Sequence, residues 1–288
     1  MTAITIRHRT IYTYEEAVSL GPHRLMLRPR ESRELRLISY EVTVSPKAQL
    51  VWSRDVFGNA VAVASIASPT DRLVIDSTAR VDLDSDPWPV FPISASAIRY
   101  PFLYSDDEWA DLGAMTVLQY EDPQDRLRIW ARGFVRGEET DTLALLKDLN
   151  AGVGNMIGYR EREEEGTQSP TETLDRGTGT CRDFAVLFAE SVRSLGFGAR
   201  IVSGYLTNPD ASDTIGSDGA GSTHAWVEVY VPGAGWISFD PTNRGMGGYN
   251  LVPVCVARNI RQTIPVSGSF AGGPIAFREM EVEVVVST

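Results

Sequence analysis

The sequence contains few cysteines and no long apolar run. Its two cysteines, Cys181 and Cys255, are too few among 288 residues for the disulfide framework of small secreted domains. No apolar stretch approaches the roughly 18–20 residues that a membrane-spanning helix needs. Near the start, Arg7 and Arg9 carry charges where the apolar core of a signal peptide would lie. We therefore expect a cytoplasmic protein without a membrane partner.

Positive charge is scarce as well. The 27 lysines and arginines stand against 38 aspartates and glutamates, which leaves a formal net charge of −11. Such a chain repels a phosphate backbone or an anionic membrane, so we expect no nucleic-acid partner. The sequence also lacks a CxxC pair, an HExxH motif and a ligand-dense calcium loop. It therefore implies no metal and no cofactor.

Residues 1–100 have the composition of a β-rich domain. Val, Ile, Thr and Tyr are frequent there, with period-two stretches and a turn signal at 55–59. We predict strands over residues 4–14, 35–45, 60–66 and 72–83. The proline-rich stretch 86–92 then breaks regular structure. The predicted organisation is a β-sandwich-like domain over 1–100, followed by a second domain over 101–288.

The second part changes to a helical period. Leu127, Trp130 and Phe134 recur at helical spacing, and the charge run 160–166 indicates a solvated loop. We predict helices over residues 109–119, 123–134, 140–149 and 181–195, and then strands over 199–206, 224–231 and 235–240. Helices followed by antiparallel strands are typical of an α+β fold.

Cys181 occupies the first position of a predicted helix. Thr180 is a good N-cap, and Asp183 three residues later completes a variant of the capping box. The positive end of a helix dipole favours the thiolate form of cysteine, and first-turn N–H groups can point at an oxyanion. A buried structural cysteine is the other interpretation, and the helix alone does not decide between them. Cys255 lies in the apolar run 251–256 and has no such setting.

His224 is the candidate general base, because His8 and His23 lie in the β-rich part. It opens a strand in which polar and aromatic residues alternate with small apolar ones. The small apolar face should pack on the core, since successive side chains of a strand point to opposite faces. We therefore expect His224 to face a groove or solvent.

Asp240 closes the next strand and precedes a proline, where an aspartate often only forms a turn. Hairpin geometry tests whether it can reach His224. If Tyr230 pairs with Trp236, the two residues share a face as diagonal neighbours about 7–8 Å apart. A four-residue loop over 232–235 would place them on opposite faces. We predict the first register.

These residues lie in motifs that resemble the bacterial transglutaminase-like superfamily. The motifs are GTCRDFA at 179–185, RSLG at 193–196, ARIVSGY at 199–205, HAWVEV at 224–229 and GWISFDPT at 235–242. The spacings of 43 and 16 residues between Cys181, His224 and Asp240 suit that pattern. Earlier stretches, over 14–30 and 55–59, are similar to the β-rich N-terminal region that these bacterial proteins often carry.

The resemblance implies a papain-like core. In such a core Cys181 attacks, His224 is general base and then general acid, and Asp240 orients His224. Trp226 follows His224 as in the family and is expected to wall the groove, with ordinary sheet packing as the alternative. Tyr159 is a candidate oxyanion donor, for which a loop aromatic is the simpler interpretation.

Two stretches leave questions open. Family members tend to have Gly-Arg-Asp-Tyr, then Asp-Val and Pro, after the triad, whereas residues 257–265 read ARNIRQTIP. Arg258 and Pro265 match, but both acids are absent. If those acids support the site elsewhere in the family, substrate choice or activity differs here. The low-complexity tract 207–223 is either a lid beside the groove or a disordered insertion.

The leading hypothesis is amide hydrolysis. A Cys181–His224–Asp240 triad would cleave a peptide or amide substrate through a thioacyl intermediate, as a cysteine protease or amidase does. Acyl transfer to an amine, the transglutaminase reaction, shares that intermediate and differs in the nucleophile that resolves it. A non-catalytic scaffold of the same fold is the third hypothesis.

Overall fold

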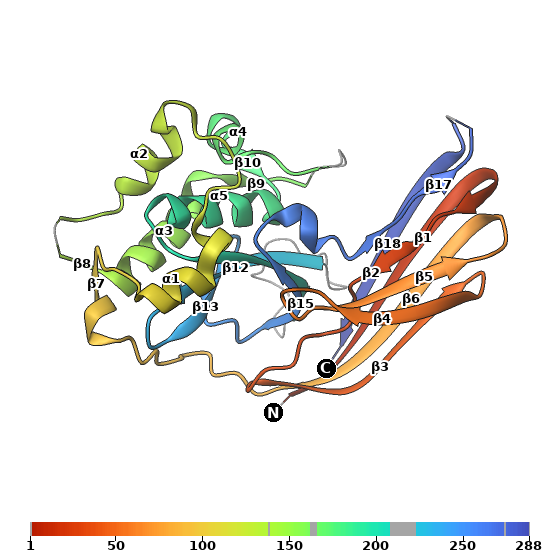
Figure 1. Cartoon of the computed structure of the whole chain (residues 1–288), viewed down its shortest axis with the longest axis horizontal. Coiled ribbons are helices and arrows are strands. Elements are labelled where there is room, and N and C mark those ends of the chain that lie inside the picture. Colours follow the sequence, from red (N-terminus) through yellow and green to blue (C-terminus); the bar gives the residue numbers. More distant parts are fainter. Residues whose placement is uncertain (1, 138, 162–165, 208–222, 274, 288) are drawn as a thin grey trace.

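The computed structural model describes residues 2–137, 139–161, 166–207, 223–273 and 275–287. Figure 1 shows twisted sheets at one end and a sheet covered by helices at the other. The chain starts in the twisted sheets, passes through the helical region and returns to the sheets. No helix in these ranges is both long and apolar enough to cross a membrane. Most of the tract 207–223 and of the charge run 160–166 lies outside the described residues.

The first sheet of the N-terminal sandwich is built around one long strand. β1 (Thr2–Leu20) pairs antiparallel with β6 (Thr70–Leu83) and with β18 (Phe277–Ser287). β3 (Leu35–Ser45) continues the sheet beyond β6, and β17 (Phe270–Ala271) pairs with the far end of β1. In the described part of the chain, β3 therefore lies at an edge.

The second sheet of the sandwich packs on the first. Its strands, in spatial order, are β16 (Val266–Ser267), β2 (His23–Leu25), β5 (Ala60–Ile66) and β4 (Ala48–Arg54). Leu25, Ala62 and Ala64 of its inner face pack with Leu73 and Ile75 of β6. Alternate residues of facing strands thus form the core between the sheets, as in other sandwiches.

The strands predicted for this region are present, with ends that differ by a few residues. The sequence places residues 277–287 in the second domain, whereas their backbone pairs with β1, from Thr5 opposite Ser287 to Tyr14 opposite Phe277. Their alternating pattern indicates a strand, but nothing local in it specifies the partner strand. The domain division at about residue 100 stays a prediction.

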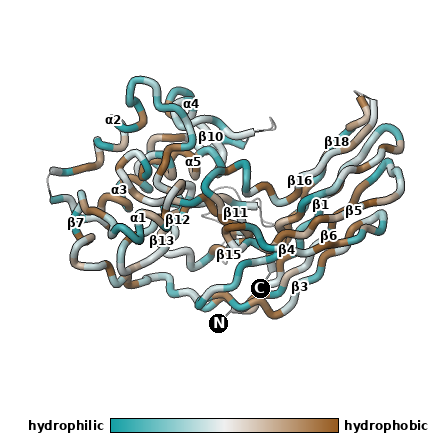
Figure 2. The backbone as a smooth tube through the Cα atoms, in the orientation of Figure 1, coloured by the Kyte–Doolittle hydropathy of each residue, from teal (hydrophilic) through white to brown (hydrophobic). Residues whose placement is uncertain are grey.

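The helical region contains an antiparallel sheet. In spatial order its strands are β14 (Gly245–Met246), β13 (Gly235–Asp240), β12 (Thr223–Val231), β11 (Ala199–Leu206) and β15 (Leu251–Ala257). Figure 2 shows that hydrophobic residues are concentrated around β11, near the middle of the molecule. Two two-stranded pairs, β7 (Arg99–Tyr100) with β8 (Thr140–Asp141) and β9 (Gly158–Tyr159) with β10 (Thr178–Gly179), flank the helices. The predicted α+β class is confirmed.

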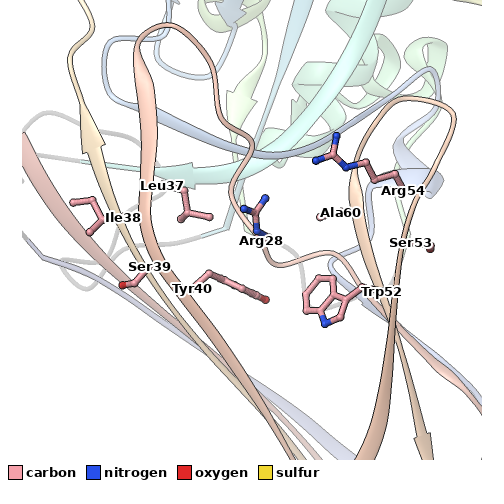
Figure 3. A pocket seen from close by; sticks show the side chains of 9 residues that line it. All are labelled: Arg28, Leu37, Ile38, Ser39, Tyr40, Trp52, Ser53, Arg54 and Ala60. Atoms are coloured by element: carbon pink, nitrogen blue, oxygen red, sulfur yellow. The ribbon is translucent and has the colours of Figure 1, made fainter.

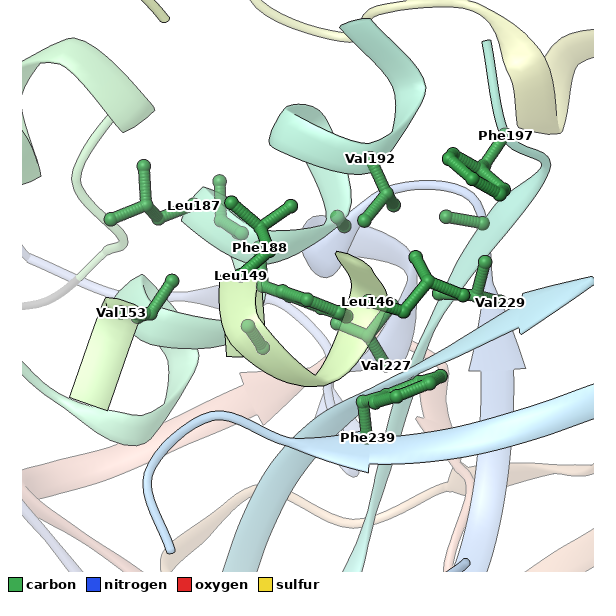
Figure 4. Packing of buried hydrophobic residues seen from close by; sticks show 14 of the residues in the cluster. Leu146, Leu149, Val153, Leu187, Phe188, Val192, Phe197, Val227, Val229 and Phe239 are labelled. Atoms are coloured by element: carbon green, nitrogen blue, oxygen red, sulfur yellow. The ribbon is translucent and has the colours of Figure 1, made fainter. Parts of the chain in front are cut away.

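One helix lies at the centre of this region. In α5 (Cys181–Ser194), every residue from Asp183 to Arg193 is buried. The helices around it are α1 (Asp106–Leu112), α2 (Arg126–Arg132), α3 (Thr142–Met156) and α4 (Pro170–Arg176). Figure 4 shows Phe188 of α5 between Leu149 of α3 and Phe239 of β13. Burying a side chain of this size stabilises the fold by about 1.5–3 kcal/mol.

Local capping explains why several helices differ from their predicted bounds. α1 begins earlier because Ser105 caps it and Glu108 completes a capping box. It ends at Gly113, whose φ of 45° a residue with a side chain rarely adopts. α2 begins later, since Asp125 has a left-handed backbone with φ 54°. α3 begins after its N-cap Asp141 and continues past the predicted end at 149 to residue 156.

Polar contacts join the sandwich to the helical region. The buried side chain of Asn59, between β4 and β5, donates from Nδ2 to the Val256 carbonyl at 2.7 Å. Its Oδ1 accepts from the Val256 N–H at 2.9 Å, so Asn59 pairs with β15 as a neighbouring strand would. His8 of β1 contacts Tyr205 of β11, with 3.0 Å between Nδ1 and the hydroxyl oxygen.

Candidate active site

Cys181 lies at the first position of α5, as predicted. One carboxylate oxygen of Asp183 accepts from the Thr180 N–H at 2.8 Å and from the Thr180 hydroxyl at 3.0 Å. The other oxygen accepts from the N–H of Gln168 at 2.7 Å. The predicted capping box is confirmed, and it fixes the turn that precedes the thiol. The Cys181 side chain itself is half-buried at the border of the main core.

The short parallel strands β9 and β10 lead the chain into this turn. Tyr159 lies opposite Gly179, two residues before Cys181. A Cβ on Gly179 would lie 2.8 Å from the Cβ of Asp183, so only glycine permits this close approach. Tyr159 is thus held in a strand, and its ring packs edge-on against Phe184 at 6.3 Å. Its role as an oxyanion donor stays a proposal.

The β12–β13 hairpin brings His224 and Asp240 together. Tyr230 pairs with Trp236, which confirms the predicted register and excludes the four-residue loop. His224 Nε2 lies 2.8 Å from Asp240 Oδ2. Both side chains are buried, at 2% and 3% exposure, so water hardly competes for this contact.

Asp240 uses its two oxygens differently. Oδ1 accepts from the N–H groups of Thr242 at 3.0 Å and Asn243 at 3.3 Å, which forms the turn. Oδ2 faces His224 and also accepts from Asn243 Nδ2 at 2.8 Å. Asp240 therefore both forms the turn and contacts His224, the two alternatives that the sequence left open. Asn243 was missed, and its one signal is a short amide side chain in the turn after Asp-Pro-Thr.

The charges of the pair are set by their mutual contact. Burial alone would lower the pKa of His224, but the charge and hydrogen bond of Asp240, together with a hydrogen bond to the Cys181 side chain, raise it to about 10. Burial also opposes ionisation of Asp240, yet the histidine and the bonds from Asn243 keep its pKa below the usual value. The contact with Asp240 therefore favours the protonated form of His224 at neutral pH. Because Nε2 faces Asp240, Nδ1 is the nitrogen available to the thiol.

The surroundings of His224 correct one expectation. The sequence predicts that it faces a groove or solvent, whereas it is buried. The second face of the sheet is covered at this end, where Trp226 packs with residues of β11 and β15 and with Phe57 of the sandwich. The Trp226 ring, 1% exposed, stacks on the His224 ring at 6.1 Å. Trp226 thus supports the imidazole from the core, and its role as a groove wall stays a proposal.

Gly204 allows this packing. It pairs with His224 across β11 and β12. A Cβ there would lie 2.1 Å from the Val252 carbonyl oxygen and 2.8 Å from the Trp226 ring. No other residue fits without moving a strand. The sequence signal for this close approach is a glycine inside an otherwise apolar strand.

The stretch 257–265, which departs from the family pattern, contacts the residue after the nucleophile. Arg182 donates to the Ile260 carbonyl at 3.5 Å. Asn259 caps the short helix η4 (Ile260–Thr263), because its side chain accepts from the Arg261 N–H at 3.0 Å. Asn259 thus caps a short helix at the position where the family pattern has an aspartate.

The other cysteine has a structural setting. Cys255 is buried, and burial raises the pKa of its thiol to about 12. Its sulfur lies 3.6 Å from the Thr263 carbonyl oxygen, which the thiol can contact as a weak donor. Within the described ranges, no group of three or more His, Cys, Asp or Glu side chains is placed to hold a metal ion.

Two family models match the chain. The bacterial transglutaminase-like N-terminal region matches residues 4–82, and the transglutaminase-like superfamily matches residues 128–241. The second match contains Cys181, His224 and Asp240. Residues 128–241 belong to the transglutaminase-like superfamily. This confirms the resemblance and the predicted arrangement, in which a β-rich N-terminal region precedes a transglutaminase-like core.

Relatives of this transglutaminase-like protein include an uncharacterized protein of Mycobacterium tuberculosis. It is 27% identical over 274 residues, which cover 91% of this chain and 86% of that protein. A protein-glutamine gamma-glutamyltransferase of Pseudomonas aeruginosa is 31% identical over 94 residues, 32% of this chain and 13% of that one. A candidate cysteine protease of Cytophaga hutchinsonii has a similar fold, with a TM-score of 0.74 at 19% identity over 99% of this chain and 91% of that one.

Proposed function

We propose that the protein is a cysteine protease or amidase that cleaves amide bonds of a peptide-like substrate. The observation that carries the proposal is the buried His224–Asp240 pair at 2.8 Å, whose imidazole is also hydrogen-bonded to Cys181. A nucleophile, a base and a group that orients the base are the parts that covalent catalysis needs.

In the first half of the proposed reaction, the Cys181 thiolate attacks the carbonyl carbon of the substrate. A C–S bond forms, and an electron pair moves onto the carbonyl oxygen. The first-turn N–H groups at the positive end of α5 stabilise this oxyanion. When the intermediate collapses, the C–N bond breaks and the His224 imidazolium gives its Nδ1 proton to the leaving amine. A thioester on Cys181 and a neutral His224 remain.

In the second half, the neutral imidazole takes a proton from water while the water oxygen attacks the thioester. The C–S bond breaks, the carboxylic acid leaves and the Cys181 thiolate returns. Asp240 stabilises the imidazolium that re-forms and holds its ring in place. Both cysteines are free, and a cytoplasmic location, which we also propose, would keep the Cys181 thiol reduced.

Acyl transfer to an amine is the second candidate. The 94-residue likeness to a gamma-glutamyltransferase supports it. An amine would replace water in the second half, and the product would be a new amide instead of an acid. All other steps would be the same.

Mass spectrometry distinguishes these reactions. The protein is incubated with a panel of peptides and esters, with and without a primary amine donor. A trapped acyl adduct that disappears in Cys181→Ala supports the thioacyl route, and Cys255→Ala is the matched control that should retain it. Free acid as the sole product means hydrolysis, and an amine-linked product means transfer. If no substrate gives an adduct and Cys181 alkylates slowly at neutral pH, the scaffold hypothesis is favoured instead.

A further inference from the structure

A groove of about 670 Å³ lies in the N-terminal sandwich, apart from the catalytic residues. Its walls are β3 of the first sheet and β4 of the second. Figure 3 shows Tyr40 of β3 beside Trp52 of β4, with the side chains of Arg28 and Arg54 near them. None of these residues takes part in the proposed catalysis.

Both walls are edges of sheets. In the described part of the chain, β3 pairs only with β6, and β4 pairs only with β5. An edge strand presents unpaired main-chain N–H and C=O groups that another strand can join. The pairing of β3 with β6 shifts register between Leu37 and Ser39, and such a bulge makes an edge less suitable for pairing. β4 pairs with β5 without a shift, so β4 is the edge that can accept a further strand.

Apolar surface is exposed along this groove. The residues Ile38 and Trp52, which line it, are each 45% exposed. The Trp52 and Tyr40 rings meet edge-to-face at 6.0 Å and 83°, which holds the indole in place. A fixed aromatic surface beside an open strand edge provides both parts of strand-addition recognition, main-chain bonds and places for side chains.

The groove is also positively charged, although the protein carries a net charge of −11. Arg54 has no ion-pair partner among the described residues, and Arg28 has only Glu31, 3.4 Å away at the surface. No acidic residue is among the described residues that line the groove. Guanidinium groups in this position are complementary to carboxylates, which they bind through charge-assisted hydrogen bonds.

We propose that the groove binds an extended peptide segment that carries Asp or Glu side chains. The segment adds to the edge of β4, its carboxylates pair with Arg28 and Arg54, and its apolar side chains rest on Trp52. Binding in the groove does not depend on chemistry at Cys181, so this proposal can be tested independently of the proposed catalytic function.

Fluorescence anisotropy with three labelled peptides tests this proposal on the full chain. The first peptide is Thr-Val-Thr-Glu-Thr-Val-Thr-Glu, in which valine and glutamate share one face of an extended strand, as Trp52 and Arg54 do in β4. The second has lysine for glutamate, and the third is the first with alternate amides N-methylated. We expect the first to bind at least about tenfold more tightly than the other two, because charge and main-chain pairing both contribute. Arg54→Glu should weaken binding of the first peptide at least about tenfold. Arg72→Glu, the same charge change at an exposed position of β6, should leave it unchanged.

Several results would overturn the proposal. The first is that the acidic peptide does not bind. The second is that the lysine peptide or the N-methylated peptide binds as tightly as the acidic one. The third is that Arg72→Glu weakens binding of the acidic peptide as much as Arg54→Glu does. Circular dichroism melting confirms that each variant is folded. Sedimentation of the unliganded protein adds a further outcome. If Arg54→Glu changes self-association while no peptide binds, the groove belongs to a second copy of the chain and the peptide proposal is wrong.

Discussion

Replacing Asp240 by asparagine removes the charge that keeps His224 protonated. Asparagine has nearly the same shape, and its side-chain oxygen can still accept from the N–H groups of Thr242 and Asn243, but its amide nitrogen cannot accept from Asn243 Nδ2. The negative charge 2.8 Å from His224 Nε2 is lost. Only the contact with Cys181 then opposes the effect of burial, so we expect the pKa of His224 to fall well below 10.

The structure sets the size and sign of the effect on stability. Each pKa unit of this fall corresponds to about 1.4 kcal/mol, and breaking a buried ion pair costs roughly 3–5 kcal/mol. The folded pKa of His224 lies above the unfolded one, so its contribution is complete below pH 6.5 and is lost as the pH rises through about 10. Asp240→Asn should therefore be less stable than wild type at pH 6, and the difference should shrink toward pH 10.

Imidazole NMR spectra can follow this titration, because the chain has only three histidines. Burial lowers the pKa of His8 to about 4, so His8 should stay neutral above pH 5 in both proteins and serve as a reference. Urea unfolding at pH 6, 8 and 10 gives the stability difference. The reasoning is refuted if wild-type His224 titrates near pH 6.5, or if Asp240→Asn leaves its titration unchanged.

Other parts of the molecule can be tested in the same way. Iodoacetamide at pH 7 should label Cys181 and spare Cys255, whose thiol pKa burial raises to about 12; peptide mapping that finds both labelled would contradict this. Gly204→Ala should lower the free energy of unfolding by at least about 1–3 kcal/mol in urea, because its Cβ would lie 2.1 Å from the Val252 carbonyl oxygen; unchanged stability would show that the strand can move. His8 has a folded pKa near 4, below its unfolded value, so wild type should lose stability as the pH falls from 6.5 through 4. In His8→Gln the drop in the free energy of unfolding between pH 7 and pH 4 should be smaller than in wild type. Urea unfolding at the two pH values measures both drops, and equal drops would show that His8 does not cause the loss.

The parts that could be predicted from the sequence depend on neighbours along the chain. Thr180 and Asp183 mark the start of α5 because a helix must satisfy its first N–H groups locally. The β12–β13 register follows from side-chain alternation across a short connection, and it places His224 and Asp240 on one face. Local rules therefore predicted both the helix that carries the thiol and the hairpin that carries the imidazole and the carboxylate.

The parts that could not be predicted depend on partners far apart in the sequence. Asn59 bonds Val256, a residue 197 positions away, and nothing in either segment specifies the other. The burial of His224 depends on Trp226 and on Phe57 from the sandwich, so strand alternation alone suggested a more open position. A period-two pattern shows that a segment is a strand and which residues share a face, but not which strand will lie beside it.

The pairing of β18 with β1 has a consequence for synthesis. The first sheet begins with residues 2–20, yet the eleven residues of β18 are translated only after the whole helical region. Until they leave the ribosome, β1 keeps an open edge along its pairing from residue 5 to residue 14, at a stage when nascent chains aggregate readily. The same edge reopens if a protease removes β18. A segment that is translated late thus protects one that is translated earlier.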